Sequence, residues 1–146
     1  MRIVPVPLSG LAGIDSLRRA LWPDSSIEQL KAIIAVKPEY LVLAAIADDG
    51  PVGFAEVSVR RDYVNGCDGS PVAFLEGIYV DPAHRNQGVA RAMAAEAMAW
   101  ARERGIAEFA SDALLANQAS HAFHKAIGFE ETERVVYFRL PLGTPA

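Results

Sequence analysis

The sequence predicts an α/β fold in which a mixed sheet carries helices on both faces. Three strand-like runs in succession are typical of antiparallel hairpins, and they lie at 40–47, 52–60 and 72–80. An Ala-rich helical segment at 89–104 leads to another strand-like run at 106–112, which predicts a β-α-β crossover with parallel strands. The chain has 146 residues, 51% of them hydrophobic, and this is enough to bury the core of one domain over 1–146.

The segment before the first hairpin predicts a short strand at 2–6 followed by two helices. Apolar residues recur at helical spacing over 11–21, and this helix should end at Trp22 because Pro23 cannot continue it. The second helix begins near Ile27 and ends before Pro38. Three residues are candidates for its N-cap: Asp24, Ser25 and Ser26.

The C-terminal half continues the alternation of helices and strands. The helix at 89–104 presents one apolar stripe and ends at Gly105; the stripe consists of Val89, Met93, Ala97 and Ala101. A further helix is expected at 117–126, ending at Gly128, and a last strand at 135–140.

The turn between the strand at 72–80 and the helix at 89–104 predicts an anion site. Its sequence is Arg85-Asn86-Gln87-Gly88-Val89-Ala90. The first N–H groups of a helix are unpaired, and with the helix dipole they attract phosphate. Gly88 lets an anion approach the backbone, Ala90 is too small to block it, and Arg85 adds a cation. An ordinary strand-to-helix turn with an exposed arginine is the alternative.

The spacing Arg-x-x-Gly-x-Ala resembles the pyrophosphate loop of the GNAT superfamily of acyl-CoA-dependent N-acyltransferases. A second segment, from Asn117 to Gly128-Phe129, resembles the one that closes the cofactor cleft in these enzymes, although Asn117 is equally a helix cap. The resemblance implies a GNAT fold with a splayed pair of parallel strands, and acetyl-CoA as acyl donor. It assigns the following residues to cofactor binding: Ile78, Tyr79, Val80, Arg85, Asn86, Gln87, Gly88, Val89, Ala90, Arg91 and Asn117.

Glu76 is the candidate base, because acyl transfer to nitrogen needs a neutral amine and a carboxylate can take its proton, directly or through water. It is a charged residue inside an apolar strand, and strict alternation places it on one face with Phe74, Ile78 and Val80. A carboxylate there is costly unless it meets a partner or an open cleft. The alternative is a solvent-facing bulge, which Gly77 would suit.

His124 stands where many GNAT enzymes have a tyrosine that is proposed to protonate the leaving thiolate. A histidine can serve as this acid, or it can be a hydrogen-bonded polar residue on its helix. His84 and His121 are expected to be surface or packing residues, and no metal site is expected.

The local sequence resembles the aminoglycoside 6′-N-acetyltransferases over nearly the whole chain, for example in Phe74-Leu75-Glu76-Gly77-Ile78-Tyr79-Val80 and Glu108-Phe109-Ala110-Ser111-Asp112. That resemblance implies resistance to aminoglycosides, and it assigns the drug pocket to Trp22, Tyr63, Glu76, Asp112 and Glu133. A polycationic sugar needs carboxylates and flat aromatic surfaces, which these residues supply. Each has an alternative: core packing for Trp22, a loop aromatic for Tyr63, a helix cap for Asp112 and a solvated charge run for Glu133.

The resemblance also implies a homodimer formed through the last strand, although that strand could belong to a monomer. A net charge of −4 argues against a nucleic-acid partner, and the chain carries neither a transmembrane run nor a signal segment. The single cysteine, Cys67, excludes an internal disulfide framework, so a cytoplasmic location is expected. Two other functions remain open: a GNAT enzyme acting on a polyamine or peptide amine, and a non-catalytic acyl-CoA sensor.

Overall fold

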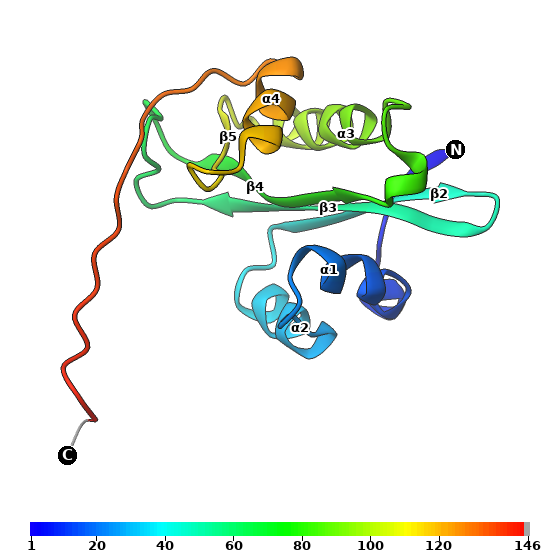
Figure 1. The fold of residues 1–146 in the computed structure, drawn as a ribbon, viewed down its shortest axis with the longest axis horizontal. Helices are drawn as coiled ribbons and strands as arrows, with labels where there is room; N and C mark the ends of the chain where they lie inside the picture. Colours follow the sequence, from blue (N-terminus) through cyan, green and yellow to red (C-terminus); the bar gives the residue numbers. More distant parts are fainter. Residues whose placement is uncertain (145–146) are drawn as a thin grey trace.

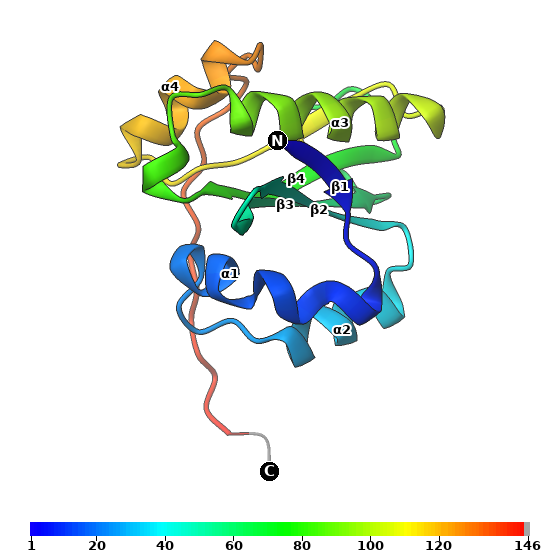
Figure 2. The same ribbon diagram turned by 90° about the vertical axis from the view of Figure 1, so that its right-hand side faces the viewer.

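The structure is a computed structural model that describes residues 1–144. One sheet forms the middle layer, with α1 and α2 on one face and α3 and α4 on the other (Figures 1 and 2). The strands are β1 (Arg2–Pro5), β2 (Tyr40–Ala47), β3 (Gly50–Arg60), β4 (Val72–Val80) and β5 (Phe109–Ser111). The helices are η1 (Leu8–Ile14), α1 (Asp15–Leu21), α2 (Ile27–Val36), η2 (Pro82–His84), α3 (Val89–Glu103) and α4 (Gln118–Ala126), where η marks a 3-10 helix.

The sheet has the order β1-β2-β3-β4-β5, antiparallel up to β4 and parallel between β4 and β5. This confirms the predicted mixed sheet and its crossover through α3. The parallel pair extends only from Ala73 opposite Phe109 to Leu75 opposite Ser111. Beyond Leu75, β4 continues to Val80 without β5 beside it, as expected of a splayed pair.

Two apolar cores lie on the two faces of the sheet. The α3 face buries the predicted stripe of Val89, Met93, Ala97 and Ala101 against β2, β3 and β4. The α1 and α2 face buries Phe54 against η1 and α2, and Ser26 caps α2 by accepting from the Gln29 backbone N–H at 3.1 Å. Burial of both faces is what fixes the register of β3 and β4.

The expected single helix over 11–21 is wrong, because η1 covers Leu8–Ile14 and the α-helix begins only at Asp15. Gly10 and Gly13 lie in η1, and glycine disfavours the α-helical interior. The strand expected over 106–112 is shorter, Phe109–Ser111, because the Ile106 N–H is used by the Ala101 carbonyl at 3.0 Å to end α3.

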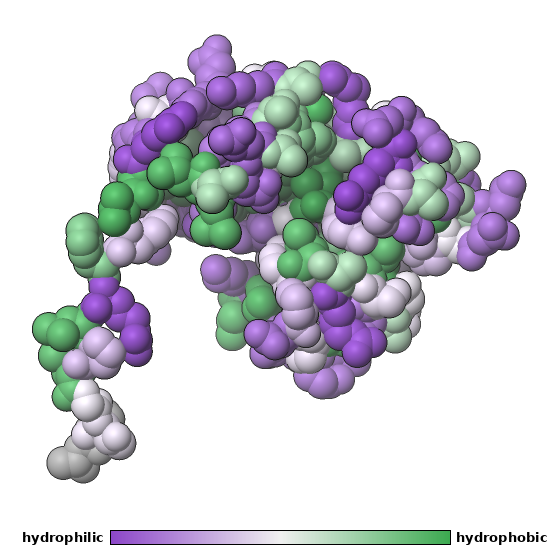
Figure 3. Space-filling view, in the orientation of Figure 1, coloured by the Kyte–Doolittle hydropathy of each residue, from purple (hydrophilic) through white to green (hydrophobic). Residues whose placement is uncertain are grey.

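The strand expected at 135–140 is also wrong for the single chain. This segment runs away from the body of the molecule as an extended tail (Figure 1), and its apolar side chains stand in the open (Figure 3). Phe138 is 92% exposed. A strand needs a partner for its backbone groups, and none of residues 1–144 pairs with this segment.

Candidate active site

The predicted anion site is an open turn at the start of α3. Gly88 is the N-cap residue, with φ of 79°, and a Cβ added there would meet nothing within 4 Å. Asn86 also has a positive φ, 62°. Within residues 1–144, the backbone N–H groups of Gln87, Gly88, Val89 and Ala90 have no hydrogen-bond acceptor. Open donors at a helix N-terminus fit the phosphates of coenzyme A.

The two arginines beside this turn are tied to backbone carbonyls. Arg85 Nε donates to the Val80 carbonyl at 2.8 Å, which uses one of the two lone pairs of this oxygen at the predicted cofactor-binding strand edge. Arg91 Nη2 donates to the Ala126 carbonyl at the end of α4, also at 2.8 Å. Both remain exposed and keep further N–H donors for an anion.

Glu76 sits at a β-bulge. The register shifts so that Glu56 faces Gly77 and Val57 faces Leu75, which leaves Glu76 as the extra residue. The expected face shared with Ile78 and Val80 is therefore wrong: these two pack in the α3 core with Leu75. The bulge was the alternative, but its carboxylate does not stand free in solvent.

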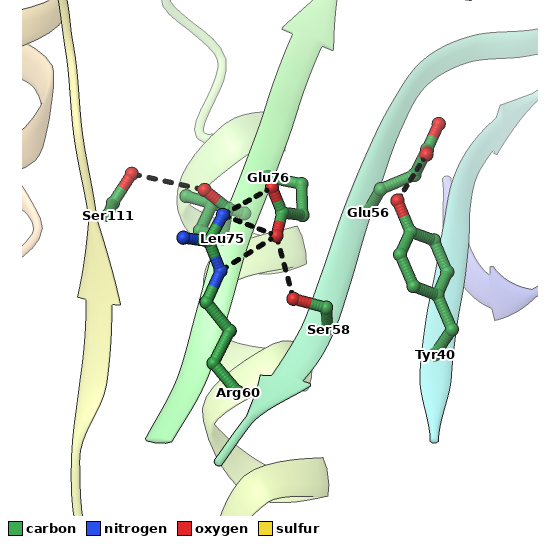
Figure 4. A network of polar contacts seen from close by, with 7 residues as sticks. All are labelled: Tyr40, Glu56, Ser58, Arg60, Leu75, Glu76 and Ser111. Carbon is green, nitrogen blue, oxygen red and sulfur yellow. Dashed lines mark hydrogen bonds and ion pairs between the residues drawn. The ribbon is translucent and has the colours of Figure 1, made fainter. Parts of the chain in front are cut away.

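Glu76 is instead held by two side chains of β3, as Figure 4 shows. Ser58 Oγ donates to its Oε1 at 2.7 Å, and Arg60 forms an ion pair with it at 2.8 Å. The Glu76 side chain is 24% exposed and that of Arg60 is 39% exposed. The carboxylate is thus fixed on the sheet yet reachable from outside.

A second carboxylate, that of Glu56, is fully buried and lies on the same face of β3 as Ser58 and Arg60. Glu56 pairs with Arg18 from α1 at 2.5 Å and accepts the Tyr40 hydroxyl at 2.7 Å. Burial, followed by the negative charge of Glu56, raises the pKa of Tyr40 far above its usual range, so its hydroxyl stays protonated. This network joins α1 to the floor of the site.

Trp22 packs directly above the bulge. A Cβ on Gly77 would lie 2.3 Å from Trp22 Cζ2, so only glycine allows this approach. The ring also stands edge-on against buried Phe54, with centroids 5.6 Å apart. Trp22 is therefore half-buried, packs against the core on this face and covers Gly77, the residue after Glu76.

The other three predicted pocket residues are exposed side chains outside the regular elements. Tyr63 is 68% exposed in the loop after β3. Asp112 is exposed and follows β5; among residues 1–144 it makes no ion pair. Glu133 is exposed in the segment after α4, next to Thr132, which contacts the same loop at Gly66. The chain thus brings 61–71 and 130–133 together, while nothing joins either segment to Glu76 directly.

His124 belongs to α4, is half-buried and contacts β5. Its Nδ1 lies 2.6 Å from the Ser120 carbonyl and its Nε2 2.8 Å from Ser111 Oγ. Ser111 Oγ in turn lies 3.3 Å from the Leu75 carbonyl, at the last paired position of β4 and β5. Asn117 caps α4 by accepting the Ser120 N–H at 3.1 Å, so its capping role is confirmed.

Comparison with known proteins agrees with this architecture. The family model "Acetyltransferase (GNAT) family" matches residues 12–129. The chain belongs to this family. An aminoglycoside N(6′)-acetyltransferase type 1 of Stenotrophomonas maltophilia is 52% identical over 128 residues, covering 86% of this chain and 84% of the relative. One of the same name from Acinetobacter genomosp. 13 is 44% identical over 146 residues, covering 98% and 100%.

Solved structures similar to this GNAT protein include two aminoglycoside acetyltransferases. The 6′-N-acetyltransferase AAC(6′)-IG from Acinetobacter haemolyticus has a TM-score of 0.88 at 43% identity, over 98% of this chain and 100% of the other. AAC(6′)-Iy, solved with the bisubstrate analogue CoA-S-monomethyl-acetylneamine, has a TM-score of 0.89 at 40% identity, over 96% and 97%.

Sequence reasoning did not select the partners of Glu76 in this GNAT protein. The signal was present, because Glu56-Val57-Ser58-Val59-Arg60 alternates polar and apolar residues along a strand.

Within residues 1–144, no group of three or more metal-ligating side chains could hold a metal ion, and no helix is both long and apolar enough to cross a bilayer.

Proposed function

We propose that this GNAT protein acetylates the 6′-amine of aminoglycosides with acetyl-CoA in a ternary complex, and so confers resistance to them. The observation that carries the proposal is the open donor turn at Gly88 on a chain whose relatives, named aminoglycoside N(6′)-acetyltransferases, are 42–52% identical over most of their length. The domain at 1–146 is the catalytic unit, and the cytoplasm is its place of action.

The turn at the start of α3 holds the acyl donor, which supplies an activated acetyl group as a thioester. The free N–H groups of Gln87, Gly88, Val89 and Ala90 bind its phosphates. Asn86, Arg85 and Arg91 line the turn, and Asn117 faces the arm of the donor from the start of α4. The edge of β4 at Ile78, Tyr79 and Val80, left open where β5 ends, pairs with the same arm as an added strand would.

Glu76 acts as the base that makes the amine nucleophilic. It takes one proton from the substrate ammonium, directly or through a water, and leaves a nitrogen lone pair. That lone pair forms the new N–C bond while the C–S bond breaks. The nitrogen then gives its second proton to water, and the sulfur receives a proton. His124 supplies this proton by way of Ser111, whose hydroxyl lies 2.8 Å from the His124 Nε2.

The cationic sugar rests against carboxylates and aromatic rings. Glu76, Asp112 and Glu133 attract its ammonium groups, and Trp22 and Tyr63 offer flat surfaces to its rings. The exposure of Asp112, Glu133 and Tyr63 supports this assignment, because each side chain is available to a ligand.

The test is release of coenzyme A thiol from acetyl-CoA with a panel of kanamycin, tobramycin, spermidine and a peptide amine. Turnover with the aminoglycosides and little with the other amines supports the proposal. Turnover with spermidine alone, or binding of acetyl-CoA without turnover of any amine, refutes it. Glu76→Gln should lower kcat about 100-fold while leaving the affinity for acetyl-CoA unchanged.

The enzyme also works as a homodimer, because the tail leaves a run of apolar side chains uncovered: Val135, Val136, Tyr137, Phe138 and Leu140. Pairing this tail with a second copy would satisfy its backbone and bury these side chains. Sedimentation of the Phe138→Asp variant should give a monomer, whereas Leu114→Asp, which changes an exposed apolar residue outside the tail, should sediment as the native protein does. A native protein that sediments as a monomer contradicts the dimer.

A further inference from the structure

The hydrogen bonds to Glu76 are divided unequally between its two carboxylate oxygens. Oε1 accepts three donors: Ser58 Oγ at 2.7 Å, Arg60 Nη2 at 2.8 Å and Arg60 Nε at 3.2 Å. Oε2 accepts one, Arg60 Nη2 at 3.0 Å. A carboxylate oxygen offers about two lone-pair sites. Oε1 is therefore saturated, and Oε2 keeps a lone pair for a further proton.

Arg60 is itself held in place from a second direction. Its guanidinium lies over the Phe74 ring, 3.5 Å from the centroid, while its edge faces the carboxylate. Ring stacking and the planar fork of an arginine together fix the orientation of the ion pair. Figure 4 shows Arg60 and Ser58 reaching Glu76 from the same strand, β3.

Arg60 is not shared with the neighbouring carboxylate. Glu56 lies on the same face of β3, but its charge is already balanced by Arg18, and the Tyr40 hydroxyl donates to it as well. Each carboxylate on this face thus has its own guanidinium. Of the two carboxylates, only Glu76 binds Arg60.

We propose that Arg60 and Ser58 are positioning residues of the reaction, which saturate Oε1 of Glu76 and so make Oε2 the atom that receives the amine proton. This rests on the proposed function, in which Glu76 is the base. The first ammonium proton passes to Oε2, the nitrogen lone pair forms the N–C bond with the thioester carbon, and the C–S bond breaks. The second nitrogen proton then goes to water, and the thiolate takes its proton from His124 by way of Ser111. Proton transfer depends steeply on alignment, so a carboxylate that rotates freely loses rate rather than binding.

The experiment compares Arg60→Ala with Arg104→Ala as a matched control. Arg104 also lies over an aromatic ring, Trp100 at 4.1 Å, but its hydrogen bond goes to a backbone carbonyl. Arg60→Ala should lower kcat about 10-fold, because Glu76 loses its positioning. It should not raise the KM of the aminoglycoside, because the substitution removes a positive charge beside a cation site. Ser58→Ala should lower kcat less, and Arg104→Ala should leave it unchanged.

Chemical rescue separates positioning from a general structural role. Methylguanidinium added to Arg60→Ala should restore part of kcat, and sodium chloride at equal ionic strength should not. Arg60→Lys keeps the charge without the planar fork, so its kcat should also fall, even if Arg60→Ala does not fold. Native kcat in a folded Arg60 variant, or rescue by salt alone, overturns the proposal.

A measurement without turnover keeps this proposal distinct from the proposed function. The Arg60 Nε–H signal in the ¹⁵N spectrum should shift in the Glu76→Gln variant. It should stay in place in Glu39→Gln, because the Glu39 carboxylate pairs with Arg61 instead. If the wild-type protein acetylates no aminoglycoside, the proposed function fails while this signal still decides the contact. A signal unmoved by Glu76→Gln overturns the role given to Arg60.

Discussion

Gly77→Ala tests the close approach of Trp22 to the β-bulge. The added Cβ would lie 2.3 Å from Trp22 Cζ2, 2.4 Å from Cη2 and 3.1 Å from Leu21 Cδ2. The ring cannot swing away freely, since its edge packs against Phe54, which is fully buried. Either the indole or the bulge must move, and both belong to the site.

The cost follows from overpacking. Forcing an extra methyl group into a packed core costs about 1–3 kcal/mol, and the two short contacts place this variant near the upper end. For a domain of this size the melting temperature should fall by about 4–10 °C. Thermal unfolding followed by circular dichroism measures the shift, and tryptophan fluorescence reports the displaced ring.

Gly13→Ala is the control, because a Cβ at Gly13 meets nothing within 4 Å. Its free energy of unfolding should stay within about 0.5 kcal/mol of the native value. A Gly77→Ala protein that melts at the native temperature with an unchanged emission spectrum would refute the reasoning, because the contact with Trp22 would then carry no strain.

Three further predictions concern the turn at the start of α3, the buried ion pair of Arg18 and Glu56, and the loop after β3. Gly88→Ala should weaken acetyl-CoA binding about 5-fold by calorimetry, because the positive φ strains the alanine by about 1 kcal/mol. Gly105→Ala, with a positive φ and open space at the other end of α3, should not alter that binding. Arg18→Met should lower the free energy of unfolding in urea by about 3–5 kcal/mol, because it leaves Glu56 buried and unpaired. The double variant Arg18→Met/Glu56→Met should regain most of that loss, and no recovery would contradict the pairing. The backbone N–H groups of Asp68 and then Gly69 hold the pKa of Glu108 below its usual value. Protection of these two amides from hydrogen exchange should therefore be complete above pH ~4.3 and fall as the pH drops through the lowered pKa. Glu108→Gln should lack this protection throughout, and equal protection in both proteins would count against the anchor.

Much of the sheet and of the open turn at the start of α3 could be predicted, because both depend on local signals. The apolar run at 72–80 and the stripe of α3 are periodic, and Gly88 sits where a strand becomes a helix. Gly105 and Gly128 end their helices with positive φ, as glycine at that position predicts.

The parts that could not be predicted depend on contacts between distant segments. Strict alternation placed Glu76 with Ile78 because the bulge is set by the register against β3, which no local pattern encodes. The strand expected at 135–140 has the right composition, but a strand also needs an edge to pair with, and the single chain supplies none for it. Arg60 was overlooked because its role appears only when β3 and β4 lie side by side.

Arg91 links the start of α3 to the end of α4. It lies in the first turn of α3, and its guanidinium donates to the Ala126 carbonyl in the last turn of α4. No residue of α4 is fully buried, so this helix depends on few such attachments. A guanidinium has five N–H donors, so Arg91 can hold Ala126 and still face an anion. One side chain thus connects the start of α3 to the helix that bears His124.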